Sequence, residues 1–178
     1  MSARLHTPVS ERDHVRGSLR APVVLVEYGD FESAHCAAAE PAVGYLRNHM
    51  GEGMAFVYRH FPVADVHPFA EIAAEASEAA AAQGKFWEMH DIIFANQDAL
   101  QADDLVAYAE ALGLDPDRFA DELSAHVYLP RIRTDFSEGV RSGVTGTPTF
   151  FINGVRYDGA RDPQVMLDML DEAAQPHP

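Results

Sequence analysis

Ser33, His35 and Cys36 lie within four consecutive residues and carry the side chains best suited to thiol chemistry. A cysteine reacts as its thiolate, and a protonated histidine nearby stabilises that thiolate by its charge. A serine hydroxyl does not attack a disulfide near neutral pH, so a Ser-x-x-Cys arrangement lacks one of the two sulfurs that dithiol exchange uses. Cys36 is the one cysteine among 178 residues, which excludes an intrachain disulfide.

The flanking sequence predicts the elements that position these three side chains. Residues 23–28, VVLVEY, are typical of a buried strand because branched apolar side chains pack well on a pleated surface. Ser33 occupies the N-cap position of a helix expected to run to about Met50, and Cys36 falls one turn inside it. The N–H groups at such a helix start carry partial positive charge, which favours a thiolate.

The remaining pattern predicts an α/β fold with an all-helical insertion. A strand is expected at 54–59, a proline-punctuated loop at 60–68, amphipathic helices between about 69 and 142, a strand at 149–152, an Asn-Gly hairpin turn at 153–154, and a final helix after Asp162. We expect residues 1–20 to form a loosely packed, irregular arm. Residues 21–176 are expected to form one domain, with the insertion at about 66–142.

The segment 28–36 resembles the active-site stretch of the DsbA-like thioredoxin family, which reads roughly (F/Y)-x-D-(F/Y)-E-C-P-Y-C. Here the same positions read YGDFESAHC. The resemblance implies a thioredoxin-like fold and thiol–disulfide oxidoreductase ancestry, with Ser33, His35 and Cys36 at the catalytic positions. Ser33 stands where the exposed, attacking cysteine belongs, so redox activity is expected to be weak, limited to a monothiol, or lost.

A second stretch, VTGTPT at 144–149, resembles the (V/I)-x-G-T-P-T loop of the same family. In that family the proline is cis and faces the redox motif across the substrate groove. The resemblance therefore implies that Thr147 and Pro148 bind substrate and that the bond between them is cis. The loop at 59–68 and the residues at 81–91 also resemble one subgroup, the thioredoxin-like domain appended to bacterial sodium/proton antiporters, and its free-standing relatives. This resemblance runs over about residues 22–172.

The sequence leaves several roles open for the two residues of the degenerate motif. Cys36 is either an inert buried thiol, whose pKa burial would raise, or a slow monothiol that forms adducts with glutathione or a partner. Ser33 is a plain helix cap, an engineered replacement of cysteine, or a hydroxyl that donates to a glutathione thiolate, as in the kappa-class glutathione transferases that share this fold. Two rival functions follow: a glutathione-dependent transferase or isomerase, and a non-catalytic peptide-binding module.

No resident cofactor is expected other than glutathione, and no metal. His60, His67, His90 and Cys36 invite a zinc interpretation, but their spacing matches no metal motif. The expected partner is a protein or peptide that offers a thiol or disulfide, or glutathione. The oligomeric state cannot be read from the sequence.

Net charge is −15 at pH 7, which argues against binding to nucleic acid or to an anionic membrane surface. No apolar run is long enough to span a bilayer, and residues 1–20 have no secretory-signal pattern, so a cytoplasmic location is expected. Residues 62–125 hold 14 of the 28 acidic residues but only Lys85 and Arg118 among the 13 basic ones. We expect this acidic surplus, including the shared face of Glu71, Glu75 and Glu78, to be the solvated outer face of the insertion; the alternative is a docking face for a basic partner.

Overall fold

The structure is a computed structural model that describes residues 3–175. The chain divides into two compact units. The sheet unit comprises Met1–Gly29, Ala38–Arg59 and Ser137–Pro178, and the helical unit comprises Asp30–Ala37 and His60–Phe136. The helical unit takes in the motif at 30–37 together with most of the predicted insertion. That residues 21–176 fold as a single domain stays a prediction.

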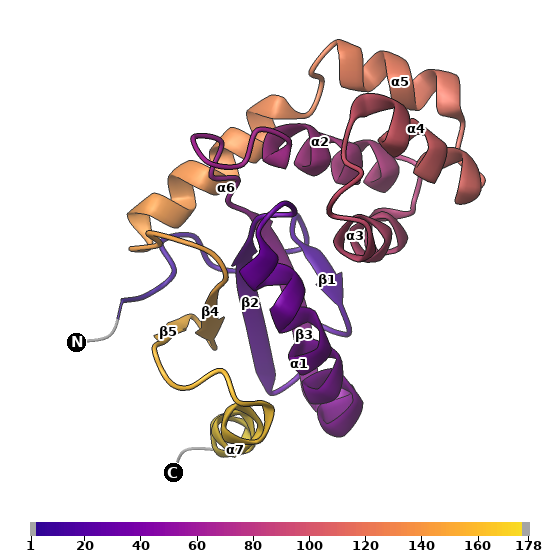
Figure 1. Ribbon diagram of the computed structural model, residues 1–178. Helices are drawn as coiled ribbons and strands as arrows, with labels where there is room; N and C mark the ends of the chain where they lie inside the picture. The colour runs from indigo at the N-terminus through magenta and orange to yellow at the C-terminus, as the bar shows by residue number, and fades with distance from the viewer. Residues whose placement is uncertain (1–2, 176–178) are drawn as a thin grey trace. The chain divides into compact units, whose positions relative to one another are not determined.

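The sheet unit is built on five strands in the order β1-β3-β2-β4-β5 (Figure 1). Their bounds are β1 His14–Arg16, β2 Val23–Gly29, β3 Met54–His60, β4 Thr149–Ile152 and β5 Val155–Tyr157. Strand β1 pairs antiparallel with β3, β2 with β4, and β4 with β5. Buried valines and aromatics fill the core of this unit, as the branched apolar pattern of residues 23–28 predicts.

Two local features of the sheet follow directly from sequence. Asn153 and Gly154 have φ angles of 47° and 80°, the left-handed conformations that a tight two-residue hairpin requires. Gly29 ends β2 where a Cβ atom would clash with the ring of Tyr58, so the strand can pass that ring only with glycine. The chain therefore leaves β2 toward the motif at a position with no room for a side chain.

The predicted irregular arm over residues 1–20 is wrong at His14–Arg16, which form β1. The physical reason is Arg59, whose buried guanidinium needs partners. Its Nε and Nη2 donate to the carboxylate of Asp13 at 2.8 and 3.1 Å, and its Nη1 donates to the carbonyl oxygen of Thr7 at 2.9 Å. A buried charge without such partners would be costly, and the N-terminal segment supplies them.

Helix α1 runs over Ala34–Met50 and is followed by a short 3-10 turn, η1, at Gly51–Gly53. The remaining helices are α2 Ala70–Ala81, α3 Phe86–Ala95, α4 Ala102–Ala111, α5 Pro116–Ser124, α6 Leu129–Arg141 and α7 Pro163–Ala174. Asp115 and Asp162 cap α5 and α7 through their side chains, as the two Asp-Pro pairs predict. The observed α/β architecture with a helical block confirms the predicted fold class.

The helical unit has its own apolar core. Helix α2 is rich in alanine, and its small buried side chains let α3, α4 and α5 approach closely. The larger side chains of this core come mainly from the next helices and include Phe86, Met89, Ile93, Leu105, Phe119 and Leu123. The ring of Phe31, in the turn at 30–37, packs against this unit through Phe94 of α3.

Candidate functional site

Ser33 caps the start of α1. The amide N–H of Cys36 donates to Oγ of Ser33 at 3.4 Å, and the amide of Ala37 donates to the Ser33 carbonyl oxygen at 3.1 Å. These are the bonds expected of an N-cap residue, which satisfies donors that the helix itself leaves without partners. The side chain is buried, with Ser33 only 3% exposed. The hydroxyl therefore faces the helix backbone.

Cys36 is completely buried, at 0% exposure, which fits the first of the two roles that the sequence leaves open, an inert buried thiol. Its sulfur accepts a hydrogen bond from the amide N–H of Asp30 at 3.5 Å. Because the attacking group in exchange is an accessible thiolate, a sulfur held this way is poorly placed to react first with a disulfide in solution. His35 and Ala34, in the same first turn of α1, are exposed. Of the three predicted catalytic residues, only His35 is accessible to a partner.

Asp30 connects the motif to the loop that follows β3. Its carboxylate accepts hydrogen bonds from the amides of Glu32 at 2.8 Å and Val63 at 2.9 Å, and pairs with Nδ1 of His67 at 2.7 Å. Its carbonyl oxygen accepts from the amide of Ser33 at 3.1 Å. The side chain is fully enclosed, so these three partners replace the water that an exposed carboxylate would have.

Gln97, two residues past the end of α3, holds the same turn. Its Nε2 donates to the carbonyl oxygens of Phe31 at 2.9 Å and Ser33 at 2.8 Å. The carboxylate of Glu32 in turn accepts from the amide of Phe69 at 2.7 Å. Sequence reasoning missed Gln97, because nothing in its local pattern distinguishes it from an exposed polar residue.

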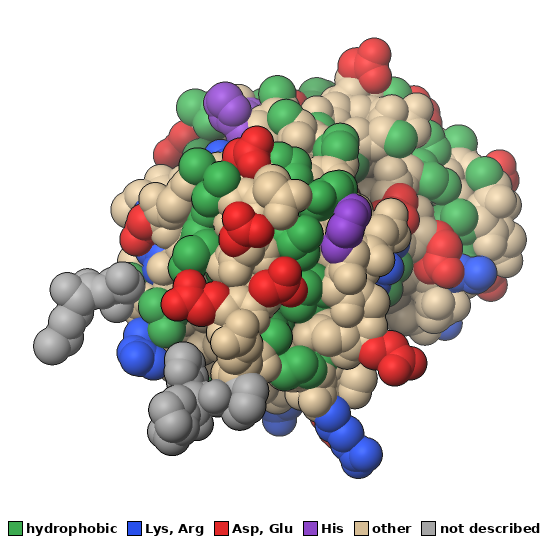
Figure 2. Space-filling view, turned by 90° about the horizontal axis from the view of Figure 1, so that it is seen from below, with side chains coloured by type: hydrophobic (Ala, Val, Ile, Leu, Met, Phe, Trp, Pro, Cys, Tyr) green, Lys and Arg blue, Asp and Glu red, His purple; other side chains and the backbone are tan. Residues whose placement is uncertain are grey.

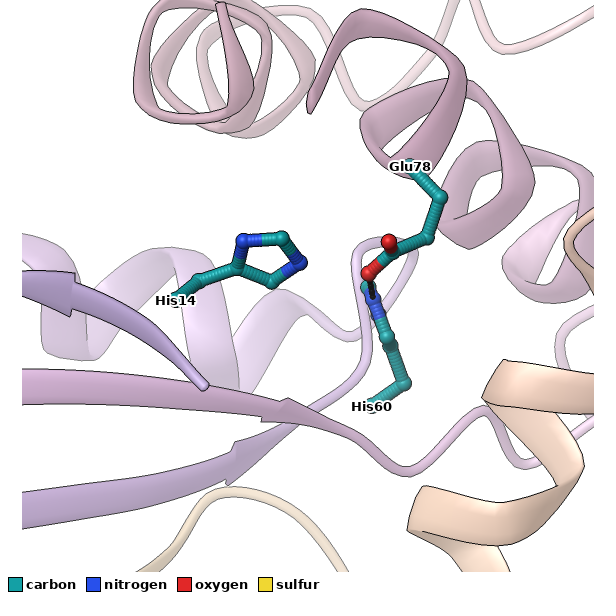
Figure 3. A group of neighbouring side chains, drawn as sticks. All are labelled: His14, His60 and Glu78. Atoms are coloured by element: carbon teal, nitrogen blue, oxygen red, sulfur yellow. Dashed lines mark hydrogen bonds and ion pairs between the residues drawn. The ribbon is translucent and has the colours of Figure 1, made fainter. Parts of the chain in front are cut away.

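Phe31 and two of the histidines form part of an aromatic cluster. The Phe31 ring lies 5.7 Å from His90 and 5.0 Å from Phe94 between ring centroids, and 6.1 Å from His60. His90 and His60 are both fully buried. The histidines that suggested zinc each have a carboxylate partner: His60 Nε2 pairs with Glu78 at 2.7 Å, His67 with Asp30, and His90 with Asp91 at 2.8 Å. Figure 3 shows the carboxylate of Glu78 directed at the His60 ring.

The expectation that Glu71, Glu75 and Glu78 form a solvated face is wrong for Glu75 and Glu78, which are 2% and 4% exposed. Glu78 also pairs with Nε of Arg131 at 3.0 Å, and Glu75 accepts from Nδ1 of His126 at 3.0 Å. Burial raises the pKa of Glu75, and its bond to His126 opposes that rise. These partners lie far away in the sequence, so helical periodicity alone could not reveal them. On the face drawn in Figure 2, acidic side chains lie among hydrophobic ones.

Thr147 and Pro148 belong to the sheet unit. The peptide bond between them is cis. The carbonyl oxygen of Pro148 accepts from Nη2 of Arg161 at 2.9 Å, and the hydroxyl of Thr149 donates to the carbonyl oxygen of Gly146 at 2.7 Å. This loop is therefore fixed at the entry to β4. The expected proximity of Pro148 to Ser33 and Cys36 stays a prediction.

Glu27 is a second feature of the sheet unit that sequence reasoning missed. It lies in β2 at 0% exposure, and neither carboxylate oxygen has a hydrogen-bond partner among the described residues. Burial raises its pKa well above the ordinary value, Glu40 adds to the rise, and Arg161 opposes it. A carboxyl group in this situation stays protonated at pH values where an exposed glutamate is ionised.

Comparison with known proteins supports the fold suggested by these elements. A family model described as thioredoxin matches residues 9–172. The oxidised form of BdbD from Bacillus subtilis superposes with a TM-score of 0.85 at 19% identity, covering 98% of this chain and 99% of that one. A thioredoxin-like oxidoreductase from Silicibacter pomeroyi gives 0.80 at 23% identity, covering 92% and 93%. At these identities the likeness shows the fold.

The curated relatives are named sodium/proton antiporters. The relative named NhaA 1 from Salinispora arenicola is 51% identical over 157 residues, which are 88% of this chain and 24% of the relative. That of Mycobacterium sp. strain KMS is 44% identical over 163 residues, 90% of this chain and 27% of the relative. The chain thus spans about a quarter of the length of the antiporters it matches. Within residues 3–175, none of the helices combines the length and apolar character needed to cross a bilayer.

Proposed function

The chain belongs to the thioredoxin family, and from this premise we propose that it is a DsbA-like member that has lost dithiol–disulfide exchange and keeps Cys36 as a shielded lone thiol. The observation that carries the proposal is the pair of positions at the start of α1. Ser33 has no sulfur atom and caps the helix, and Cys36 is fully buried. The chain has the fold of a thiol–disulfide oxidoreductase without its pair of sulfurs.

The chemistry of exchange explains why one sulfur does not support the dithiol route. In a dithiol enzyme, one thiolate attacks the disulfide of the substrate and a second thiolate releases the resulting mixed disulfide. If the Cys36 thiolate attacked glutathione disulfide, it would form one mixed disulfide and release one glutathione thiolate. This chain has no second cysteine to release that adduct. Burial of Cys36 slows even the first step, because the sulfur must first become accessible.

Insulin reduction by dithiothreitol tests this proposal. The unmodified protein should not accelerate the reaction, whereas Ser33→Cys should give measurable activity by restoring the attacking sulfur. Ser33→Ala is the matched control, because it changes the same side chain without adding a sulfur, and it should stay inactive. Turnover by the unmodified protein would contradict the proposal.

A second candidate function is a peptide-binding module. Val66 and Phe69 are 66% and 38% exposed, and the amide of Phe69 is bonded to Glu32 of the motif turn. Exposed apolar side chains fixed beside the motif favour recognition of a protein or peptide segment. Under this candidate, peptide binding measured by calorimetry should persist in Cys36→Ser. Loss of binding in that variant would argue against it.

The glutathione-dependent alternative has less support, because Ser33 is buried and its hydroxyl already accepts from the Cys36 amide. Calorimetric titration with glutathione tests it, and saturable binding that disappears in Ser33→Ala would revive it. The antiporter names of the relatives lead us to propose a protein partner, and the net charge of −15 disfavours nucleic acid. A cytoplasmic location stays a prediction, to be tested by cell fractionation.

A further inference from the structure

Asp30 lies at the junction of the motif turn, the loop after β3, and the Cys36 thiol. Its carboxylate accepts a hydrogen bond from the amide of Val63 and pairs with Nδ1 of His67. Both of these residues lie in that loop. Its backbone N–H donates to the sulfur of Cys36 at 3.5 Å. One residue therefore connects the loop to the lone thiol.

Within the His67–Asp30 pair, His67 is the residue that solvent can reach. The His67 side chain is 28% exposed, whereas the Asp30 side chain is 0% exposed. Each hydrogen bond that a fully buried carboxylate accepts stabilises it. Removal of one donor leaves a carboxylate oxygen without that bond inside the protein, which is costly. Loss of the His67 bond should therefore weaken the hold of Asp30 on the loop without removing any apolar side chain from the core.

We propose that Asp30 and His67 are positioning residues for Cys36. The His67–Asp30 bond fixes the loop at 61–69 to the motif turn, and the same turn directs the Asp30 amide to the sulfur and keeps that sulfur away from solvent. The inference rests on the proposed function, in which Cys36 is a shielded lone thiol. It adds that the accessibility of the Cys36 sulfur depends on the His67–Asp30 bond and not on the global stability of the fold.

The chain offers a control for this inference. His126 also pairs with a buried carboxylate of the helical unit, that of Glu75, at 3.0 Å. None of the hydrogen bonds described for this second pair involves the turn at 30–36. His126 has a φ of 52°, so glycine replaces it without backbone strain. His126→Gly therefore removes a histidine–carboxylate pair while leaving the Cys36 environment unchanged.

The test is the rate at which iodoacetamide labels Cys36 in the folded protein, followed by mass spectrometry at increasing urea concentrations below the unfolding transition. Labelling through local opening depends weakly on urea, whereas labelling through global unfolding rises steeply with it. His67→Leu should label about tenfold faster without urea and with little urea dependence, since the lost bond involves a buried charge. His67→Asn places a side-chain N–H close to the position of Nδ1, so its rate should stay close to that of the unmodified protein. His126→Gly should also be labelled at a rate close to that of the unmodified protein.

Three results would overturn the inference: no change in His67→Leu, equal rates for His67→Leu and His67→Asn, or equal acceleration by His126→Gly. Circular dichroism checks folding first. If His67→Leu does not fold, His67→Ala replaces it, because alanine offers no side-chain donor to Asp30, and Asp30→Asn should accelerate labelling in the same way. Rapid labelling of the unmodified protein would instead overturn the proposed function, so the two failures are distinguishable.

Discussion

The backbone amide of Cys36 donates to the hydroxyl oxygen of Ser33 across 3.4 Å. The side chain at position 33 is thus engaged with the helix start and is almost completely covered. In the family that this sequence resembles, a cysteine at this position attacks the substrate disulfide. The serine keeps the local helix start, and under the proposed function it removes that attack.

The capping bond predicts that Ser33→Ala lowers the free energy of unfolding by about 0.5–2 kcal/mol, the usual effect of removing an N-cap side chain. Urea denaturation measures the change. Ala34→Ser is the matched control, because residue 34 is exposed and lies inside the helix. If Ser33→Ala is as stable as the unmodified protein, the cap assignment is incorrect.

Gln97 should be important for the stability of the motif turn. Its Nε2 donates to two carbonyl oxygens of the turn. Because Gln97→Leu removes both hydrogen bonds, it should lower the free energy of unfolding by about 1–3 kcal/mol. Asn96→Ala is the control, since Asn96 follows α3 directly and its side chain donates to the carbonyl oxygen of Ile92 in the last turn of that helix. Equal effects of the two substitutions in urea denaturation would argue against a special role for Gln97.

Glu27 should make stability depend on pH. In the unfolded chain a glutamate ionises at about 4.3, whereas burial raises the pKa of Glu27 in the folded protein. At pH values between the pKa of the unfolded chain and the raised pKa of the folded protein, the folded state binds more protons than the unfolded state. The contribution of Glu27 to the free energy of unfolding therefore falls as pH rises. Glu27→Gln removes this contribution, which amounts to at most about 1.4 kcal/mol per pH unit.

Chemical denaturation at several pH values measures the effect, as the difference between Glu27→Gln and the unmodified protein. The relative stability of Glu27→Gln should increase with pH across this window. Glu52→Gln, at an exposed position, should show no such trend. A difference that is independent of pH would contradict the raised pKa of Glu27.

The buried pairs of α2 predict unequal effects along one helix. Glu78→Leu removes the buried carboxylate that pairs with the buried His60 and with Arg131, so it should lower the free energy of unfolding by about 3 kcal/mol or more. Glu71→Leu, on the same helix but without such burial, should change it by about 0.5 kcal/mol or less. Similar losses for the two variants would show that Glu78 is not held as described.

The sequence predicted most helices and strands because their signals are local. The Asp-Pro caps, the Asn-Gly turn and the apolar run of β2 depend on neighbouring residues, and each appears in the structure. The place of Cys36 one turn inside α1 was predictable for the same reason. These elements are determined by backbone preference and by burial of one face.

The contacts around the motif could not be predicted in the same way. Asp30 reaches His67, Gln97 reaches Ser33, and Glu78 reaches Arg131, and each pair is separated by more than thirty residues. A polar residue looks solvent-exposed in the sequence whenever its partner is distant. The same limitation produced the incorrect expectations for β1 and for the buried glutamates of α2.

The accessibility of Cys36 tests the central claim most directly. We predict that iodoacetamide labels the folded, unmodified protein slowly at neutral pH and that labelling accelerates sharply once denaturant unfolds the chain, because the sulfur is completely buried and accepts the Asp30 amide. Fast labelling of the folded protein, with a midpoint in its pH profile below the ordinary thiol value of about 8.5, would contradict the account and show an activated thiolate.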